Sequence, residues 1–178
     1  RHGCIASRQL FITKAAPLSL NFYIKQPVCY QDRNGSLQAT VSGGIIPYQY
    51  RWTGSSSIDA SAGALPAGTY TLSVTDAAGC VIARKDSLQN PAQLPLNLGS
   101  NRFICNGQTI RYDITVPGQT GIAYNWTGTN GFGSMQPIVD ITQAGVYTAS
   151  VSDLKGCNRT ASVTLTPSDI KVENEFVL

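Results

Sequence analysis

The side chains best suited to covalent chemistry in this 178-residue chain are five cysteines that recur at a nearly constant interval. Three follow a glycine, at Gly3-Cys4, Gly79-Cys80 and Gly156-Cys157, and these pairs are almost evenly spaced along the chain. The other two, Cys29 and Cys105, are separated by the same interval as the first two pairs. Cysteines in register, without the CxxC or Cys/His spacing of a zinc site, predict structural disulfides in an oxidising compartment.

Two pairing schemes are compatible with this register. One bridge per repeat would join Cys29 to Cys80 and Cys105 to Cys157, with Cys4 left over. However, Cys105 precedes a turn at one end of the expected domain and Cys157 follows a turn at the other end, and Cα atoms more than about 7 Å apart cannot be bridged. The alternative joins Cys29 to Cys157 across consecutive repeats and leaves Cys4, Cys80 and Cys105 to partners outside the chain. The sequence leaves both schemes open.

Other catalytic and ligand-binding patterns are missing from the sequence. The only histidine, His2, lies near the N-terminus, and no nucleophile–base pair, carboxylate pair or phosphate-binding glycine loop occurs within a repeat. Charged residues are 13% of the chain and the net charge is +3, with no basic run for nucleic acid. No apolar stretch approaches the ~18 residues that span a bilayer. We therefore predict a non-enzymatic protein with no cofactor, no metal site and no membrane span.

Two aspartates stand at the start of matching turns. Asp76 begins Asp76-Ala77-Ala78-Gly79, and Asp153 begins Asp153-Leu154-Lys155-Gly156. Aspartate at this position accepts hydrogen bonds from backbone N–H groups, and glycine supplies a positive φ, so both predict tight hairpin turns. One aspartate per turn is too few for calcium, which needs several oxygen ligands.

Runs of alternating apolar and polar residues show which elements hold these turns, because alternation with period two is typical of a half-buried strand. The apolar members are Leu37, Ala39 and Val41; Tyr48, Tyr50 and Trp52; Tyr70, Leu72 and Val74; Ile110, Tyr112, Ile114 and Val116; Ile122, Tyr124 and Trp126; and Tyr147, Ala149 and Val151. Short strands with frequent glycine turns predict an all-β fold of tandem immunoglobulin-like β-sandwiches.

Four aromatic residues are predicted to be structural. Trp52 and Trp126 lie mid-strand on the apolar face, which is the central core position of such a sandwich; an aromatic platform for sugar or peptide is the alternative. Tyr70 follows the L-x-x-G-x-Y pattern of a tyrosine corner, and Tyr147 repeats it more loosely.

The repeat sets the expected domain boundaries. Leu18-Ser19-Leu20-Asn21 recurs as Leu94-Pro95-Leu96-Asn97 at the interval that also separates Cys29 from Cys105, and an interval of this size indicates one small domain per repeat. We expect the last strand of an upstream module in residues 1–17, complete modules in 18–93 and 94–168, and the start of a further module in 169–178. Linkers this short predict a semi-rigid array.

The first module resembles the SprB repeat. The resemblance is carried by Ser42 to Trp52, SGGIIPYQYRW, and by Leu65 to Cys80, LPAGTYTLSVTDAAGC, which combine GG-x-x-PY-x-Y-x-W with AGTY and TD-x-x-GC. In the second module Pro117-Gly118-Gln119-Thr120-Gly121 replaces GG-x-x-P, so that module is closer to the PKD-like or immunoglobulin-like modules that accompany SprB repeats.

This resemblance implies a segment of a large Bacteroidota cell-surface adhesin of the gliding-motility type. It would be secreted by the type IX machinery to the outer face of the outer membrane. The implied partners are neighbouring modules of the same chain, that machinery and surface glycans. Asp86-Ser87-Leu88 resembles an O-glycosylation site of that phylum, which makes Ser87 a candidate beside its interpretation as a strand-end serine.

Two other functions are compatible with the sequence. The chain could be an accessory segment of a secreted hydrolase whose catalytic domain lies elsewhere, or a stalk whose only partner is the export machinery. If a ligand site exists, the Gly/Ser-rich segments 54–64 and 128–136 are the candidates, because binding residues tend to lie on loops of a rigid scaffold.

Overall fold

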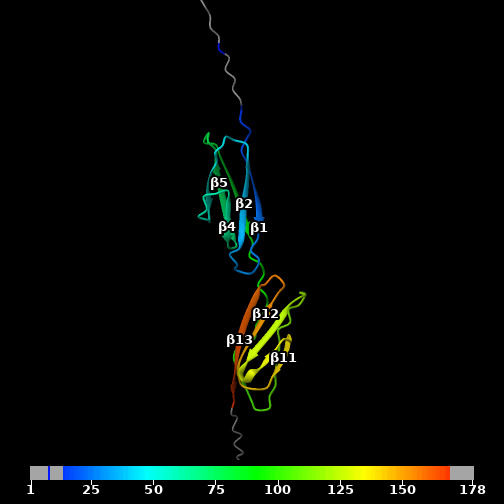
Figure 1. Cartoon of the computed structure of the whole chain (residues 1–178). Coiled ribbons are helices and arrows are strands. Elements are labelled where there is room, and N and C mark those ends of the chain that lie inside the picture. The colour runs from blue at the N-terminus through cyan, green and yellow to red at the C-terminus, as the bar shows by residue number, and fades with distance from the viewer. Residues whose placement is uncertain (1–7, 9–13, 169–178) are drawn as a thin grey trace, which may run out of the picture. The chain divides into compact units, whose positions relative to one another are not determined.

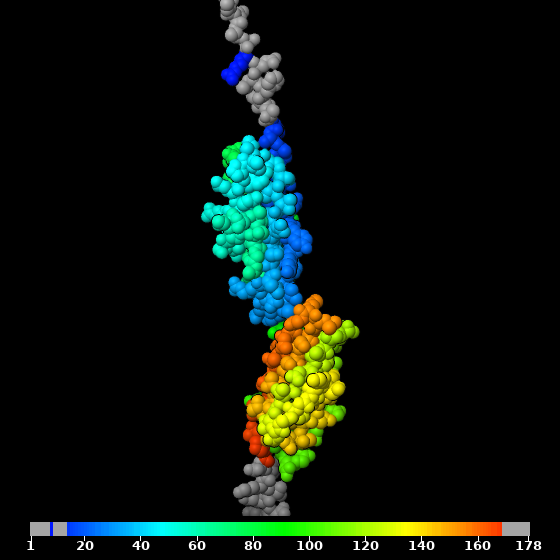
Figure 2. All heavy atoms as spheres, viewed as in Figure 1, coloured from blue at the N-terminus to red at the C-terminus, as the bar shows by residue number. Residues whose placement is uncertain are grey.

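The computed structural model describes residues 8 and 14–168, and in these residues the chain is built from β-strands with a single 3₁₀ turn (Figure 1). It divides into two compact units. The first unit contains the described residues up to Pro27 and Gln31–Asn90, and the second contains Val28–Tyr30 and the residues from Pro91 onward. In Figure 2, blue to green atoms accordingly gather in the first unit and green to red atoms in the second.

The division lies at Asn90–Pro91, a few residues before the expected boundary at 93/94. The strand expected in residues 1–17 lies mostly outside the described residues, and residues 14–17 are not in a strand. The start of a further module, expected in 169–178, lies outside them entirely. Among the described residues, no helix is long and apolar enough to cross a membrane.

The first unit is a sandwich of two antiparallel three-stranded sheets. Its strands are β1 (Ser19–Lys25), β2 (Gly35–Ser42), β3 (Gln49–Thr53), β4 (Ser61–Leu65), β5 (Gly68–Thr75) and β6 (Val81–Leu88). The sheets have the orders β1-β2-β4 and β3-β5-β6. The alternation predicted in β2 and β5 buries Leu37 in one sheet and Leu72 and Val74 in the other, with side chains that are completely inaccessible to solvent. This confirms the predicted all-β sandwich.

Trp52 lies in the core of the first unit. Its ring stacks on Phe22 at 5.6 Å between centroids, which joins β3 of one sheet to β1 of the other. Its indole Nε1–H donates to the backbone carbonyl oxygen of Asp59 at 2.8 Å, so the one polar atom of this buried ring is satisfied.

The second unit has one strand more than the first, and its outer strands are paired differently. Its strands are β7 (Arg102–Ile104), β8 (Ile110–Asp113), β9 (Ala123–Gly128), β10 (Gly133–Ser134), β11 (Ile138–Ile141), β12 (Gly145–Ser152) and β13 (Asn158–Pro167), with the 3₁₀ turn η1 (Thr129–Gly131) after β9. The sheets have the orders β10-β9-β12-β13-β7 and β11-β8. The short β7 pairs in parallel with β13, whereas β1 of the first unit pairs antiparallel with β2.

In the second unit, some residues that alternate in the sequence lie outside the hydrogen-bonded strands that the alternation predicts. The alternation of Ile110 to Val116 predicts one strand, but β8 ends at Asp113 because the carboxylate of Asp113 accepts a hydrogen bond from the N–H of Thr115 at 2.9 Å. The side chains of Ile114 and Val116 are nevertheless buried. Leu94, Leu96 and Leu98 likewise fill the core from a segment outside the strands.

Trp126 is the centre of the second core. Its side chain is fully buried and lies 5.9 Å from the ring of Tyr112, between centroids. Phe132 meets Tyr147 edge-on at 5.2 Å. Aromatic residues from β8, β9, β12 and the turn after η1 therefore close this core, as the mid-strand positions of Trp52 and Trp126 led us to expect.

Both predicted tyrosine corners have the expected hydrogen bond. The Tyr70 hydroxyl donates to the carbonyl oxygen of Pro66 at 2.8 Å, and the Tyr147 hydroxyl donates to that of Gln143 at 3.0 Å. In each case the acceptor lies four residues upstream. Burial raises the pKa of Tyr147, so its hydroxyl stays protonated, and a donor, to a higher pH than that of an exposed tyrosine. Together with the tryptophan on the third strand of each unit, these corners identify the sandwiches as immunoglobulin-like.

We expect Trp126→Ala to lower the free energy of unfolding of the second unit by about 3–5 kcal/mol, the usual effect of truncating a large buried aromatic side chain. Urea unfolding followed by near-UV circular dichroism will measure this. The matched control is Met135→Ala, since the Met135 side chain is 79% exposed. A loss of stability in Met135→Ala as large as that in Trp126→Ala would contradict this account of the core.

Candidate functional site: two cysteine-bearing aspartate turns

The turn that follows β5 is organised by the side chain of Asp76. Its Oδ1 accepts hydrogen bonds from the N–H of Ala78 at 2.9 Å and from the N–H of Cys80 at 2.8 Å. The backbone closes the same turn, because the Asp76 N–H donates to the Cys80 carbonyl oxygen at 2.9 Å and the Gly79 N–H donates to the Asp76 carbonyl oxygen at 3.0 Å. These four bonds fix the turn and place the backbone of Cys80 directly before the last strand, β6.

The turn that follows β12 repeats this arrangement around Asp153. Its Oδ1 accepts from the N–H groups of Lys155 and Cys157, both at 2.9 Å. The Asp153 N–H donates to the Cys157 carbonyl oxygen at 3.0 Å, and the Gly156 N–H donates to the Asp153 carbonyl oxygen at 3.1 Å. The glycines have φ values of 83° and 86°, in the left-handed region that the turn requires. Asp-x-x-Gly-Cys is therefore one structural unit built twice.

The first of these turns has an additional connection. The second carboxylate oxygen of Asp76 accepts from the N–H of Ile45 at 3.0 Å, and Ala77 donates to the Ile45 carbonyl oxygen at 2.8 Å. A Cβ at Gly44 would lie 2.8 Å from this carboxylate oxygen, so the loop can approach it only with glycine there. These hydrogen bonds between the backbone of Ile45 and the Asp76 turn explain why GG-x-x-P and TD-x-x-GC occur together in the first unit. In the second, within the described residues, Asp153 has no such partner.

Hydrogen bonding controls the ionisation of Asp76. Burial acts to raise the pKa of this carboxyl group, but the hydrogen bonds from the backbone of Ile45, Cys80 and Ala78 outweigh it and leave the pKa below its usual value. The bonds favour the charged form, which can accept them all. Asp76 is the only buried charged or polar residue among those the structure describes, and its burial depends on these donors.

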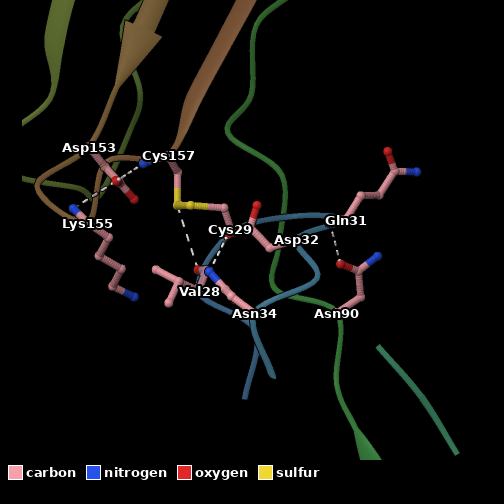
Figure 3. Close-up of a disulfide and its surroundings, with 9 residues drawn as sticks. All are labelled: Val28, Cys29, Gln31, Asp32, Asn34, Asn90, Asp153, Lys155 and Cys157. Atoms are coloured by element: carbon pink, nitrogen blue, oxygen red, sulfur yellow. Dashed lines mark hydrogen bonds between the residues drawn. A yellow bond between two sulfur atoms is a disulfide. The ribbon is translucent and has the colours of Figure 1, made fainter. Parts of the chain in front are cut away.

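The second turn carries a disulfide between Cys157 and Cys29 (Figure 3). Their Cα atoms are 5.4 Å apart, within the range that a disulfide spans, and the two residues are separated by 128 positions in the sequence. This is the second of the two schemes considered above. The alternative pairs, Cys29–Cys80 and Cys105–Cys157, are not formed, and Cys4 lies outside the described residues.

The segment that carries Cys29 is held at both ends. Before it, the side chain of Gln26 accepts a hydrogen bond from the N–H of Gln89 at 2.7 Å. After it, the N–H of Gln31 donates to the side chain of Asn90 at 2.9 Å, as Figure 3 shows. Both contacts tie the loop between β1 and β2 to the residues that follow β6. The intervening Val28–Tyr30 belong to the second unit, where Cys157 lies.

Cys80 and Cys105 are free thiols, the first exposed and the second partly exposed. Cys80 occupies in its aspartate turn the position that Cys157 occupies in the other. Cys105 lies between β7 and β8, as Cys29 lies between β1 and β2. Within residues 8 and 14–168, no three His, Cys, Asp or Glu side chains gather to hold a metal ion.

The other candidate residues are dispersed over the units. Ser87 lies partly buried in β6, and its hydroxyl accepts a hydrogen bond from the Gln89 side chain at 3.0 Å. The candidate segment 54–64 is not all loop, because β4 begins at Ser61, although Ile58 within it is 80% exposed. Segment 128–136 contains η1 and β10 and borders a hollow of about 230 Å³ that Tyr147 also lines.

Comparison with known protein families finds one family that matches part of the first unit. The model of the SprB repeat family matches residues 21–57, which span β1 to β3 and include the Gly43-Gly44 loop that contacts Asp76. A comparison with curated protein sequences finds no match.

Several solved structures are similar at low identity. DIP-gamma IG1+IG2 is 10% identical with a TM-score of 0.45, covering 85% of this chain and 98% of that one. The insect immune protein hemolin is 12% identical with a TM-score of 0.36 and coverages of 82% and 46%. Domains 4 and 5 of the S-layer protein SbsC are 11% identical with a TM-score of 0.32 and coverages of 86% and 100%.

The structural and sequence findings agree on the class of the protein. It is a pair of immunoglobulin-like repeat modules, the first of which contains a segment similar to the SprB repeat. Because disulfides form and persist in oxidising environments, the Cys29–Cys157 bond is consistent with an extracellular, secreted module.

We expect the stability of the first unit to fall with acid in a way that depends on Asp76. Its lowered pKa means that its contribution is fully present above the unfolded-state value of about 3.9 and is lost as the pH falls below that value through the folded-state pKa. Asp76→Asn should therefore be less stable than the parent at neutral pH, and the difference should shrink below about pH 4. Thermal unfolding as a function of pH measures both. An unchanged acid profile in Asp76→Asn would contradict the assignment.

Proposed function

We propose that this chain is a non-catalytic segment of a large, multi-module cell-surface adhesin, of the gliding-motility type, in which it is a semi-rigid spacer that transmits tension. Its source would be a member of the Bacteroidota, and its export would use the type IX secretion machinery. The similarity of residues 21–57 to the SprB repeat supports this assignment. The second unit, which lacks the GG-x-x-P loop, would be the PKD-like module that accompanies such repeats.

The observation that carries the spacer role is the course of the covalent chain. The disulfide closes a loop that contains every described strand except β1, which precedes Cys29, and β13, which follows Cys157. A force applied to the two ends of the chain therefore passes along β1, through the disulfide and along β13. The strands from β2 to β12 and the peptide link at Asn90–Pro91 are bypassed.

This path suits a protein that must transmit force without lengthening. A sandwich whose strands are all in series with the load can unravel and release its full contour length. In this chain the disulfide withholds the 128-residue loop from extension even when both cores unfold. The two loaded strands are each paired along their length, β1 with β2 and β13 with β12 and, at its end, with β7, so each resists withdrawal through a row of backbone hydrogen bonds.

Single-molecule force spectroscopy on the chain, held at its two ends, tests the tension-transmitting role. With the disulfide intact, the loop between the two cysteines should not contribute to extension. Reduction should release up to about 420–460 Å more, because the 128 residues of the loop extend by about 3.3–3.6 Å each. Cys157→Ser should behave like the reduced protein.

Cys80→Ser is the matched control for that measurement, since it removes a free thiol from the equivalent turn. It should extend as little as the parent. Full-length extension of the oxidised parent chain would refute the load path. The chain-entropy model assigns about 5 kcal/mol to closing a loop of this size, so reduction should also lower the thermal stability of the protein.

Surface display is tested separately in cells that express the parent protein. An antibody raised against this chain should label intact cells, and external protease should remove the epitope. Blocking type IX export should leave the epitope inside the cell. Labelling only after permeabilisation of export-competent cells would contradict the adhesin role, and a parent chain with a catalytic domain would favour the accessory segment of a hydrolase.

Surface glycans are the proposed ligands, with segments 54–64 and 128–136 as the candidate contacts, and Ser87 is the proposed O-glycosylation site. A glycan array with the isolated chain tests the first idea. Binding should be reduced by Ile58→Ser or Met135→Ser, which alter the most exposed apolar side chains of the two segments. A signal no higher than background would leave the spacer role alone. Intact-mass measurement of the natively expressed protein, beside Ser87→Ala, tests the second.

A further inference from the structure

The two free thiols are each the counterpart of one partner in the existing disulfide. Cys80 and Cys157 end the two aspartate turns, and the hydrogen bonds around them are nearly equal in length, with N–H to Oδ1 distances of 2.8 and 2.9 Å and N–H to carbonyl distances of 2.9 and 3.0 Å. The turn thus presents its cysteine in the same backbone geometry in both units. In the second unit this cysteine is disulfide-bonded, and in the first it is exposed and free.

Cys105 is the counterpart of Cys29 by position and by the way its loop is held. The loop around Cys29 is tied to Gln89 and Asn90, the residues that follow the last strand of the first unit. The residue before Cys105 is also tied to the residue that follows the last strand of its unit, here by a backbone bond that continues the pairing of β7 with β13, because the carbonyl oxygen of Ile104 accepts from the N–H of Ser168. A further pair of hydrogen bonds, between the backbone of Cys105 and Gln108, fixes the cysteine itself.

We infer that Cys105 and Cys80 are the two halves of a further disulfide site of the kind formed by Cys29 and Cys157. Cys105 forms a disulfide with the cysteine that ends the aspartate turn of a following repeat. Cys80 forms one with the cysteine between the first two strands of a preceding repeat. The partner is thus a second copy of the Asp-x-x-Gly-Cys turn, which another molecule of this chain can supply. The inference follows from the register of this chain and does not require the adhesin role.

The surface beside Cys105 has room for such a turn. A hollow of about 490 Å³ lies against the cysteine and is also lined by Asn106, Thr142, Gln143, Ala144 and Pro167, among others. These residues come from the loop that carries Cys105, from the segment before β12 and from the end of β13. Their uncharged amide, hydroxyl and apolar side chains suit a turn whose own aspartate already has its hydrogen-bond donors.

The bond itself forms by thiol–disulfide exchange. The oxidant is a disulfide compound, such as oxidised glutathione or a disulfide oxidoreductase. The thiolate of one cysteine attacks this compound and forms a mixed disulfide, and one thiol is released. The second cysteine then displaces the other half of the oxidant as a thiol. Two protons and two electrons pass from the cysteines to the oxidant, and one S–S bond is exchanged for another.

Two complementary variants test the pairing in a Cys4→Ser background, which removes the cysteine outside the described residues. One carries Cys80→Ser and keeps Cys105, while the other carries Cys105→Ser and keeps Cys80. A size tag on one of them distinguishes heterodimers from homodimers on a non-reducing gel after equilibration in a glutathione redox buffer. Random pairing makes heterodimers as abundant as the two homodimers together. We expect this ratio of heterodimer to homodimers to rise at least about tenfold, the factor that 1.4 kcal/mol of specific contact provides. Peptide mapping should find Cys80 linked to Cys105.

Substitutions beside the thiol separate a docked turn from a chance collision. Thr142→Arg, placed on the partner that keeps Cys105, fills the hollow without changing the cysteine and should remove the heterodimer excess. Thr160→Arg introduces the same side chain at an exposed position of β13 outside the hollow and should leave the excess intact. Circular dichroism and thermal unfolding confirm that both variants fold.

Three results would overturn the inference. They are heterodimers no more abundant than the two homodimers together, absence of cross-linked species under conditions that preserve the Cys29–Cys157 bond, and an equal response to Thr142→Arg and Thr160→Arg. No excess of heterodimers, or an equal response to the two arginine substitutions, would mean that the thiols react because they are exposed and not because the turn docks beside Cys105. The second of the three results would mean that the hollow does not accept the turn.

Discussion

The structure depends on a carboxylate that replaces backbone hydrogen-bond partners in the turn between the last two strands of each sandwich. The five residues between the last two strands include N–H groups that the sheet ladder cannot satisfy, and buried or half-buried donors without acceptors are costly. Asp76 and Asp153 each accept two of these N–H groups with one oxygen, and glycine gives the chain the positive φ that lets both donors point at it. The cysteine that ends each turn takes part in two of the turn's hydrogen bonds, one through its N–H and one through its carbonyl oxygen.

This turn explains how two sandwiches with different edges present a cysteine in one geometry. The first strand pairs antiparallel in one unit and parallel in the other, and the sheets contain three and three strands or five and two. These differences lie at the outer strands. The hairpins β5–β6 and β12–β13 each form eight consecutive residue pairs counted from the turn, so the strands that flank the turn are paired alike in both units, although β6 is an edge strand and β13 also pairs with β7. A cysteine needed in a defined place is best attached to the least variable part of the fold.

Much of this architecture can be predicted from the sequence, because a strand with one buried face has an apolar residue at every second position. The alternation at Leu37, Leu72, Val74, Trp126 and Val151 identifies strands and core together, and L-x-x-G-x-Y predicts the hydrogen bond of Tyr70. A side chain that takes a backbone N–H away from the strand ladder is harder to predict. Asp113 ends β8 in this way, although Ile114 and Val116 continue the alternation. Leu94 to Leu98 show the converse, because side chains can fill a core from a segment without ladder bonds.

The choice between the two disulfide schemes needed information that no local pattern holds. It depends on which ends of the strands approach one another, and the contacts that decide it join residues far apart in the sequence, such as Gln31 with Asn90 and Cys29 with Cys157. The same is true of the bond from Ile45 to Asp76, which links two motifs 31 residues apart. Sequence register shows which cysteines are equivalent, whereas only the fold shows which are neighbours.

A disulfide across repeats solves a problem that one within each repeat would not. Each sandwich is small, so its core alone gives modest stability. Bridges inside the repeats, Cys29–Cys80 and Cys105–Cys157, would strengthen each core, but they would leave β6, the link at Asn90–Pro91 and β7 in series with an external load as well as β1 and β13. The bond from Cys29 to Cys157 instead puts β1 and β13 alone in the covalent path, and it stabilises the chain by closing a long loop as well. If the cysteines of further repeats pair in the same register, an array of such modules is held by a covalent path much shorter than its polypeptide. Unfolding of any one core then changes the length of the array little, which is the property a long surface filament under tension requires.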